Sequence, residues 1–264
     1  MISNFKKQAK ESLKGNWGNA IVVFLGIYFL GSFISSIPQY FVMPSYISML
    51  SEFENLEVFN IEELLRIMGA FMSIIFALSM VTSIFVVAIL QLGQNRFSIK
   101  LARTGVADVD CMFDGFKKNY FLNVKSLFMV GIYSFLWMIP FIVFTFGWMY
   151  TFSKGSEIYI LFIILSFAAQ IFAYIKILGY SVLNYLLMDD EVEFNTSTEY
   201  INESKRLMKG SKWQLVLLGL SFILWIFVVV ITFGFAMIYL GPYMSQSITN
   251  FYNHIREEKN IAYE

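Results

Sequence analysis

The apolar positions of this chain occur in long uninterrupted runs, separated by shorter polar segments rich in lysine and arginine. A helix needs about 20 apolar residues to cross a bilayer, and the runs reach or approach that length. The pattern predicts an all-α fold, a polytopic transmembrane helical bundle of about six spans, in a single integral membrane domain over residues 1–264. The expected spans are residues 20–42, 67–92, 127–152, 158–187, 213–231 and 235–254.

The last two spans depend on how one apolar stretch is divided. Residues 213–243 carry no charge and are too many for one comfortable span. Thr232 and Gly234 predict a tight turn that separates a fifth span from a sixth, more polar helix. The alternative is a single long, kinked fifth helix, which gives five spans.

The distribution of basic residues predicts an orientation. The segments before the first, third and fifth spans are rich in lysine and arginine, whereas the other two loops hold only Arg66 and Lys154. Basic segments stay on the cytoplasmic side of a membrane. We therefore expect the N-terminus inside. Six spans would place the C-terminus inside as well, and five would place it outside.

Two of the basic segments have the spacing of amphipathic helices on the cytoplasmic side. One covers residues 1–19, and the other follows a capping box at residues 196–199 and stops at Gly210. Such helices lie at the interface with their lysines toward anionic headgroups, and Trp213 would mark the headgroup level. The expected apolar positions are Ile2, Phe5, Ala9, Leu13 and Trp17 in the first helix and Ile201, Ser204, Leu207 and Met208 in the second.

A weak internal repeat accompanies these segments. "SLKGNWGNAIVVFLG" (residues 12–26) and "RLMKGSKWQLVLLGL" (residues 206–220) share an apolar-Lys-Gly-polar-Trp approach to a span, and "FKKNYFLNVKSLFMVG" (residues 116–131) is a degenerate third copy. Three units of an interfacial helix and a helical hairpin would account for six spans. The alternative is that any basic-to-aromatic approach to a membrane has this form.

Composition removes several function classes. Hydrophobic residues make up 58% of the chain and charged residues only 14%, where a soluble domain has roughly 25% charged. The net charge is zero, which gives no basic field for nucleic acid. Cys111 and His254 are the only residues of their types, which removes intrachain disulfides and most zinc and triad chemistry. We expect no enzyme activity, no catalytic residue, no cofactor and no metal site.

One acidic group and one lysine are the remaining candidates for chemistry. Asp189, Asp190 and Glu191 end the fourth predicted span, and paired carboxylates can bind a cation or act as acid and base. At a membrane exit we favour a solvated helix end. If one even helix covers residues 158–187, Lys176 lies near its middle, where an ionisable group indicates function. We favour a span that ends near Ile175, so that Lys176 reaches the inner headgroups and a partly interfacial segment follows.

Several stretches of the chain resemble a known family. They are "AKESLKGNW", "FDGFKKNY", "ESKRLMKGSKW", "LSFILWIF", "TFGFAMIYLGPY" and "FYNHI". In order and spacing they are similar to the bacterial integral membrane family "domain of unknown function 975". The resemblance implies a polytopic membrane protein of mainly Gram-positive bacteria and implies no activity. The chain departs from the family at Pro140-Phe141, where the family usually has Pro-Gly.

These observations favour a structural or accessory protein of the bacterial cytoplasmic membrane, multi-pass with its N-terminus inside. Its expected partners are anionic inner-leaflet headgroups or another membrane protein, and not nucleic acid. The alternative is a small transporter or permease subunit with a polar path near Lys176. The candidate functional or lipid-contacting residues are Lys14, Trp17, Lys176, Lys205, Arg206, Lys209, Lys212 and Trp213.

Overall fold

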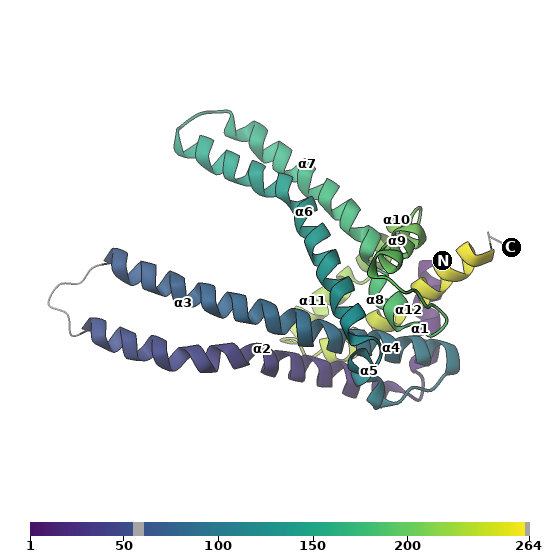
Figure 1. Cartoon of the computed structure of the whole chain (residues 1–264). Coiled ribbons are helices and arrows are strands. Elements are labelled where there is room, and N and C mark those ends of the chain that lie inside the picture. Colours follow the sequence, from purple (N-terminus) through teal and green to yellow (C-terminus); the bar gives the residue numbers. More distant parts are fainter. Residues whose placement is uncertain (55–60, 262–264) are drawn as a thin grey trace.

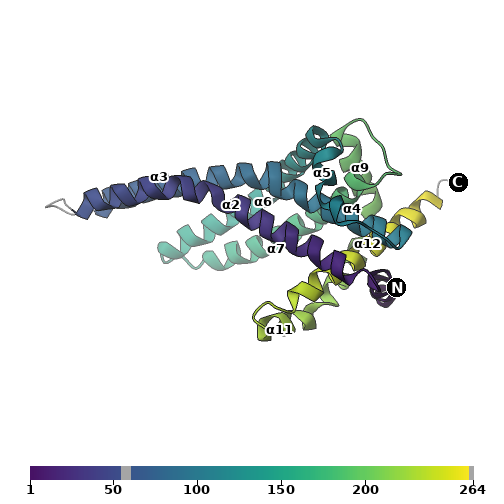
Figure 2. The ribbon, with the colours of Figure 1, turned by 90° about the horizontal axis from the view of Figure 1, so that it is seen from below.

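Two long helical hairpins project to one side of a compact cap (Figure 1), and a third, shorter one leaves the cap in another direction (Figure 2). The cap comprises the helices within residues 2–13, 88–117 and 183–208 and the C-terminal part of the last helix. The computed structural model describes residues 1–54 and 61–261, and these residues contain no β-strand. A view turned by 90° shows that the described ends of the chain both lie at the cap (Figure 2). The all-α prediction is confirmed. The hairpins diverge instead of closing into one bundle, and in a bilayer no hydrophobic force draws them together, because lipid tails are as apolar as their side chains.

Unit 1 combines a short helix with the longest hairpin. Its elements are α1 (Ile2–Leu13), α2 (Trp17–Glu54), α3 (Ile61–Thr82), the π-helical turn η1 (Ser83–Val87) and α4 (Ala88–Thr104). Helix α2 leads away from the cap, α3 returns beside it, and α4 continues α3 into the cap (Figure 1). Inside the cap α4 contacts elements of all three units, so it is the central helix of the fold.

Unit 2 repeats this arrangement. Its elements are the 3-10 turn η2 (Val109–Phe113), α5 (Asp114–Lys117), α6 (Tyr120–Ser153), α7 (Tyr159–Ile177), the 3-10 turn η3 (Leu178–Tyr180) and α8 (Leu183–Met188). Helices α6 and α7 pack along each other, and Pro140 lies inside α6 without ending it. The predicted span 158–187 is therefore not one even helix. Helix α7 ends at Ile177, close to the expected position, and most of the segment after it is buried in the cap. Its partly interfacial location stays a prediction.

Unit 3 consists of the last four helices. They are α9 (Ser197–Met208), α10 (Lys212–Leu220), α11 (Ile223–Ile231) and α12 (Met237–Ile261). Between α11 and α12, Phe233 and Gly234 have φ of 50° and 92°, which confirms the predicted tight turn. The single kinked helix is wrong, because α12 returns to the cap and packs against α1. The break between α10 and α11 was not predicted.

The same turn connects the cap to each hairpin. A lysine in extended conformation is followed by a residue with positive φ, and the first helix of the hairpin begins one or two residues later. Glycine adopts positive φ freely, and asparagine tolerates it better than most other residues. The geometry therefore confirms the internal repeat, including its degenerate copy. The turns are Lys14 (ψ 118°) with Gly15 (φ 86°), Lys118 (ψ 111°) with Asn119 (φ 47°), and Lys209 (ψ 116°) with Gly210 (φ 88°).

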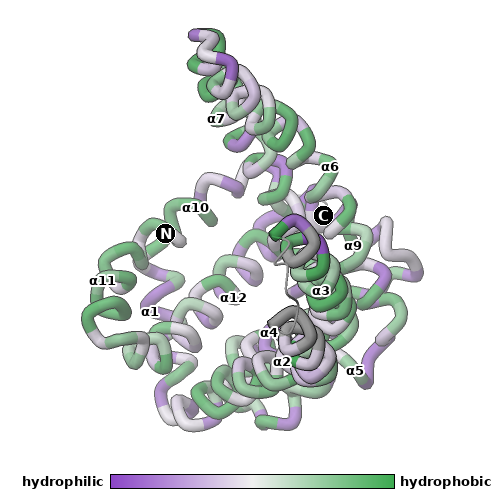
Figure 3. Tube along the Cα trace, turned by 90° about the vertical axis from the view of Figure 1, so that its left-hand side faces the viewer, coloured by the Kyte–Doolittle hydropathy of each residue, from purple (hydrophilic) through white to green (hydrophobic). Residues whose placement is uncertain are grey.

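Five helices among the described residues are long and apolar enough to cross a membrane. They are Trp17–Ser48, Leu65–Thr104, Tyr120–Ser153, Tyr159–Met188 and Lys212–Ile231. They contain four of the first five predicted spans in full and all but the first residue of the predicted span 158–187. The predicted sixth span, residues 235–254, lies in the more polar α12, and its crossing of a membrane stays a prediction. The hairpins are predominantly apolar along their length (Figure 3), and large side chains such as Phe29, Phe76 and Phe146 are well exposed on them.

The two amphipathic helices are present, and their apolar faces pack against other helices of the cap. The capping box at Thr196 and Glu199 of α9 is confirmed. The face of α1 with Phe5 and Leu13 is buried and packs against α12. The face of α9 is buried against α6, α8 and η3 in the same way. A period of 3.6 residues suits a lipid surface and a protein core equally, so the sequence pattern did not separate them.

Candidate functional site

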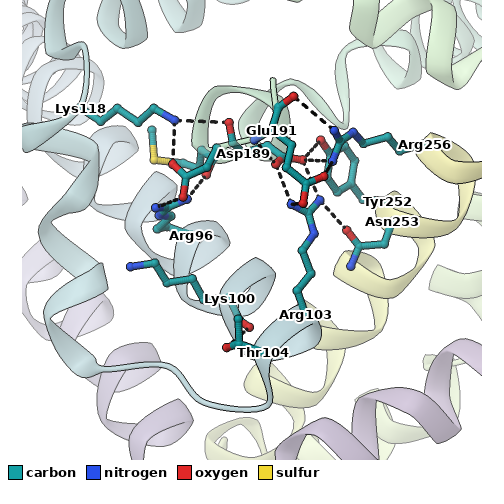
Figure 4. Close-up of polar contacts among 12 residues, drawn as sticks. Arg96, Lys100, Arg103, Thr104, Lys118, Asp189, Glu191, Tyr252, Asn253 and Arg256 are labelled. Atoms are coloured by element: carbon teal, nitrogen blue, oxygen red, sulfur yellow. Dashed lines mark hydrogen bonds and ion pairs between the residues drawn. The ribbon is translucent and has the colours of Figure 1, made fainter. Parts of the chain in front are cut away.

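A buried carboxylate, Asp189, lies at the centre of the cap directly after α8, with no exposed surface (Figure 4). Arg103 donates two hydrogen bonds to it, from Nη1 to Oδ1 at 2.7 Å and from Nη2 to Oδ2 at 2.8 Å. Nη1 of Arg256 donates to Oδ2 at 2.9 Å, and the Tyr252 hydroxyl donates to the same oxygen at 2.7 Å. The backbone N–H of Glu191 donates to Oδ1 at 3.1 Å. Both carboxylate oxygens of Asp189 are therefore fully engaged.

This network joins the three units. Asp189 follows the last helix of unit 2, Arg103 lies in the last turn of α4 in unit 1, and Tyr252 and Arg256 belong to α12 in unit 3. Tyr252 and Arg256 are four residues apart, which places them on one face of α12. The bidentate arginine contact fixes direction as well as distance. The arrangement therefore holds the ends of three helical units in one geometry.

The charge state of Asp189 follows from its surroundings. Burial by itself would raise the pKa of this carboxyl group, because it disfavours the charged form. The hydrogen bonds from Arg103 and Tyr252 and the charge of Arg103 outweigh burial and lower the pKa of Asp189 to about 2. Asp189 is therefore ionised at neutral pH and balances cations that are themselves partly buried.

Asp190 forms a second, more exposed ion pair beside the first. Its side chain is 59% exposed and pairs with Arg96 and with Lys118, whose Nζ lies 3.1 Å from Oδ1. Nη1 of Arg96 also donates to the Met188 carbonyl at 2.9 Å. Burial raises the pKa of Asp190, but the hydrogen bonds and charges of Arg96 and Lys118 lower it overall. The two ion pairs of Asp190 anchor the end of α8 to α4 and to the turn before α6.

The structure corrects the interpretation of the acidic group. The side chains of Asp190 and Glu191 are exposed, as expected of a solvated helix end, but Asp189 is buried and ion-paired. The missed partners lie far along the chain, 86 residues away for Arg103 and 67 for Arg256. The sequence contained one signal for these partners, because basic residues recur at intervals of one or two turns along α4. Among the described residues no three His, Cys, Asp or Glu side chains are grouped as a metal site requires.

Three of the predicted lysines come together elsewhere in the cap. Lys176 from α7, Lys205 from α9 and Lys212 from α10 converge near the end of α7; we call them the lysine cluster. Nζ of Lys212 donates to the Ile175 carbonyl at 2.6 Å, and its charge interacts with that of Lys176. A Cβ atom on Gly179 would lie 3.7 Å from Cγ of Lys205 and 3.9 Å from Nζ of Lys212. Within the described part of the chain, none of the three forms an ion pair.

Aromatic rings form the base of the lysine cluster. They belong to α6, α7 and η3. The ammonium groups lie at cation–π distances, which supply modest stabilisation without neutralising the charge. Nζ of Lys176 lies 5.0 Å from the ring centroid of Trp137 and 5.1 Å from that of Phe172. Nζ of Lys205 lies 5.5 Å from the ring centroid of Tyr133 and 5.3 Å from that of Tyr180.

The other predicted residues lie apart from the lysine cluster. Lys14 and Lys209 are exposed in their turns, and Trp213 is 65% exposed at the start of α10. Trp17 stacks on Tyr239 of α12, with ring centroids 4.3 Å apart, so it packs against protein. Arg206 pairs with Glu203, with Nε donating to Oε2 at 2.7 Å.

The fold first indicates the class of protein to which this chain belongs. Five helices long and apolar enough to span a membrane, arranged as hairpins on a polar cap, indicate an all-helical membrane protein. The chain belongs to the family described as "Protein of unknown function (DUF975)", whose sequence model matches residues 1–259. The resemblance seen in the sequence is thereby confirmed. Neither a comparison with curated proteins nor one with solved structures gives a match.

Proposed function

We propose that this chain is a structural or accessory protein of the bacterial cytoplasmic membrane, and not an enzyme. Its cap faces the cytoplasm and binds anionic lipid headgroups, and a membrane-protein partner would use the same face. The observation that carries the proposal is the lysine cluster, three cations drawn together from α7, α9 and α10. Apart from Arg66 and Lys154, the lysines and arginines belong to the cap or to the helix ends nearest it, which favours a cytoplasmic cap.

Electrostatics explains why the lysine cluster suits a phosphate group. Like charges held close together repel, and a nearby anion removes that repulsion. A phosphate oxygen also accepts charge-assisted hydrogen bonds from ammonium groups. The position fits a headgroup, because Lys176 lies in the last turn of a long apolar helix and Trp137 beside it is typical of the membrane interface.

The transporter alternative has less support from this geometry. A polar path near Lys176 would place that side chain inside a bundle of spans. Lys176 is instead exposed at the cap end of α7, with its ammonium over the rings of Trp137 and Phe172. We therefore favour contact with headgroups over a path across the membrane.

Lipid titration tests the proposal. We compare the delipidated wild-type chain in detergent with a triple variant of the lysine cluster, Lys176→Gln, Lys205→Gln and Lys212→Gln. Native mass spectrometry follows added phosphatidylglycerol and phosphatidylcholine. Each lysine near an anionic surface contributes about 1 kcal/mol, so the triple variant should bind phosphatidylglycerol about a hundredfold more weakly.

The matched control removes the same charge elsewhere. Lys7, Lys117 and Lys125 are exposed cap lysines outside the lysine cluster, and their glutamine triple variant should bind phosphatidylglycerol almost as the wild type does. Equal losses in the two triple variants would mean that net charge alone matters. Equal affinity of the wild type for the two lipids would refute headgroup binding.

A further inference from the structure

The described hairpins leave two neighbouring cavities where they join the cap. One, of about 530 Å3, lies among α2, α4, α8 and α12. The other, of about 670 Å3, lies among α3, η1, α4, α6 and α7 with the turn after it. Gln91 and Asn184 line both cavities. We call the two cavities together the amide chamber. It is separate from the ion network of Asp189, none of whose residues line it.

Four neutral amide side chains face the amide chamber without a partner. Gln91, Gln94 and Asn95 lie on one face of α4, at spacings of three and four residues, and Asn184 lies opposite on α8. Within the described residues, none of the four side chains makes a hydrogen bond. Gln91 is exposed and the other three amides are half-buried, so a ligand in the amide chamber can reach them and pair with them beside its apolar walls.

The amide chamber is polar at one end and apolar at the other. The four amides lie toward the cap, because α4 runs into the cap and α8 belongs to it. Toward the hairpins the larger cavity is lined by apolar side chains, among them Met80, Ile84, Phe128 and Phe135. These walls continue into the exposed apolar surfaces of α3 and α6. An amphiphile fits this gradient, with its polar part at the cap.

The polar part of that ligand is uncharged. Among the described residues, no aspartate, glutamate, lysine, arginine or histidine lines either cavity. Each amide offers both a donor and an acceptor, which suits ester carbonyls and hydroxyl groups. A phosphate held at this depth would lack a cation, because the lysine cluster lies outside the lining.

The wall of the amide chamber also contains an irregular helix. Ser83 and Ile84 in η1 line the larger cavity, and Val87 in η1 lines the smaller one. π-Helical turns of this kind are frequent at functional sites. The Phe85 carbonyl accepts a hydrogen bond from the Tyr120 hydroxyl at 3.0 Å, which ties this turn to the start of α6.

We propose that the amide chamber binds an uncharged glycerolipid of the diacylglycerol class. Its hydroxyl and ester groups pair with Gln91, Asn184 and the neighbouring amides. Its acyl chains run along α3 and α6 into the bilayer. This site is independent of the lysine cluster, since its ligand lacks phosphate and its affinity does not depend on salt.

Photo-crosslinking of the full-length chain tests this site. The chain is reconstituted in phosphatidylcholine nanodiscs with a diacylglycerol that carries a diazirine in one acyl chain. Peptide mapping should place the crosslinks in residues 80–88 and 127–135. The double variant Gln91→Leu with Asn184→Leu loses two hydrogen-bonding groups, so labelling should fall about tenfold.

A second variant and two controls separate loss of ligand from loss of fold. Gly131 lines the larger cavity, and a Cβ added there would meet no atom within 4 Å, so Gly131→Leu fills the site while it keeps every amide. It should also reduce labelling about tenfold. Gln170→Leu on α7 and Gly69→Leu on α3 make the same changes outside the lining and should label as the wild type does.

Three results would overturn the proposal. The first is an absence of crosslinks in both segments, or an equal loss in the control variants. The second is stronger, salt-sensitive labelling of the same segments by a diazirine phosphatidylglycerol, which would make the ligand charged. The third is disulfide formation between two copies of a Phe128→Cys variant in the nanodiscs, which would make a second copy the occupant.

Discussion

Asp189 combines complete burial with hydrogen bonds from two arginines, a tyrosine and the following backbone. A buried carboxylate of this kind is held in place by its partners, and they in turn depend on it. Removal of its charge leaves Arg103 and Arg256 partly buried without their shared counter-ion. This type of loss is more costly than the loss of an exposed ion pair.

We therefore expect Asp189→Asn to destabilise the folded chain by about 3–5 kcal/mol. The side chain of Asp190 is 59% exposed, so Asp190→Asn should cost no more than about 1 kcal/mol. Unfolding in mixed detergent micelles, followed by tryptophan fluorescence, measures both values. Equal losses of folding free energy in the two variants would contradict the conclusion that Asp189 holds the three units together.

The same residue predicts a pH dependence. The pKa of Asp189 is about 2 in the folded chain and has a reference value of 3.8, so the unfolded chain binds more protons between these values. Stability from this group is complete above about pH 4 and falls by about 2 kcal/mol as the pH drops through the folded pKa. Acid unfolding of wild type and Asp189→Asn should show this step in the wild type alone. A step of the same size in the variant would assign it to other groups.

Lys176 and Asp189 show which features could be predicted from the sequence and which could not. The end of α7 at Ile177 was expected, since local length limits place Lys176 near a helix end. The burial of Asp189 was missed, because its arginine partners are set by the tertiary packing of α4 and α12 and not by any local pattern. Local rules favoured a solvated helix end there, and they hold for Asp190.

At the scale of elements, local chemistry predicted turns better than packing. The Lys-Gly turns and the capping box of α9 were readable because a few neighbouring residues determine them. The buried faces of α1 and α9 were assigned to lipid, since the apolar period is the same for either environment. The π-turn η1 and the break between α10 and α11 have no proline or charged residue to mark them.

The contact between α4 and η2 provides a test at this scale. A Cβ atom at Gly93 would overlap the Met112 carbonyl oxygen, and backbone cannot move aside as a side chain can. Gly93→Ala should force the elements apart and cost about 2 kcal/mol or more. Gly69 also lies in a helix, but a Cβ atom there would meet no atom within 4 Å. Gly69→Ala should therefore stabilise the folded chain by up to about 1 kcal/mol. The measurement is the free energy of unfolding in mixed detergent micelles. An unchanged value in both glycine variants would contradict the contact between α4 and η2.

At the scale of the whole molecule, the three hairpins lead away from one cap and return to it (Figures 1 and 2). Helix α1 packs against α12 within the cap, so the N-terminal helix and the end of the last helix lie at the same end of the molecule. If the hairpin of unit 3 enters the bilayer like the other two, its second helix supplies the sixth span.

Cysteine labelling in intact cells tests this topology. Ser3→Cys and Glu257→Cys lie at the cap and should resist an impermeant thiol reagent, whereas Lys154→Cys at the far end of the second hairpin should react. Native Cys111 is buried, so background labelling should be low. Reaction at Glu257→Cys with protection at Ser3→Cys would leave five spans. Protection at Lys154→Cys with reaction at Ser3→Cys would invert the orientation.

The position of Asp189 in chain order has a consequence for biosynthesis. The chain is synthesised from its N-terminus, so Arg103 and Asp189 are both made before Tyr252 and Arg256. A nascent or truncated chain without α12 therefore carries a buried carboxylate with only part of its final set of donors. Such a chain is less stable and more open to degradation than the finished one. The set of donors to Asp189 is complete only once α12 has been made.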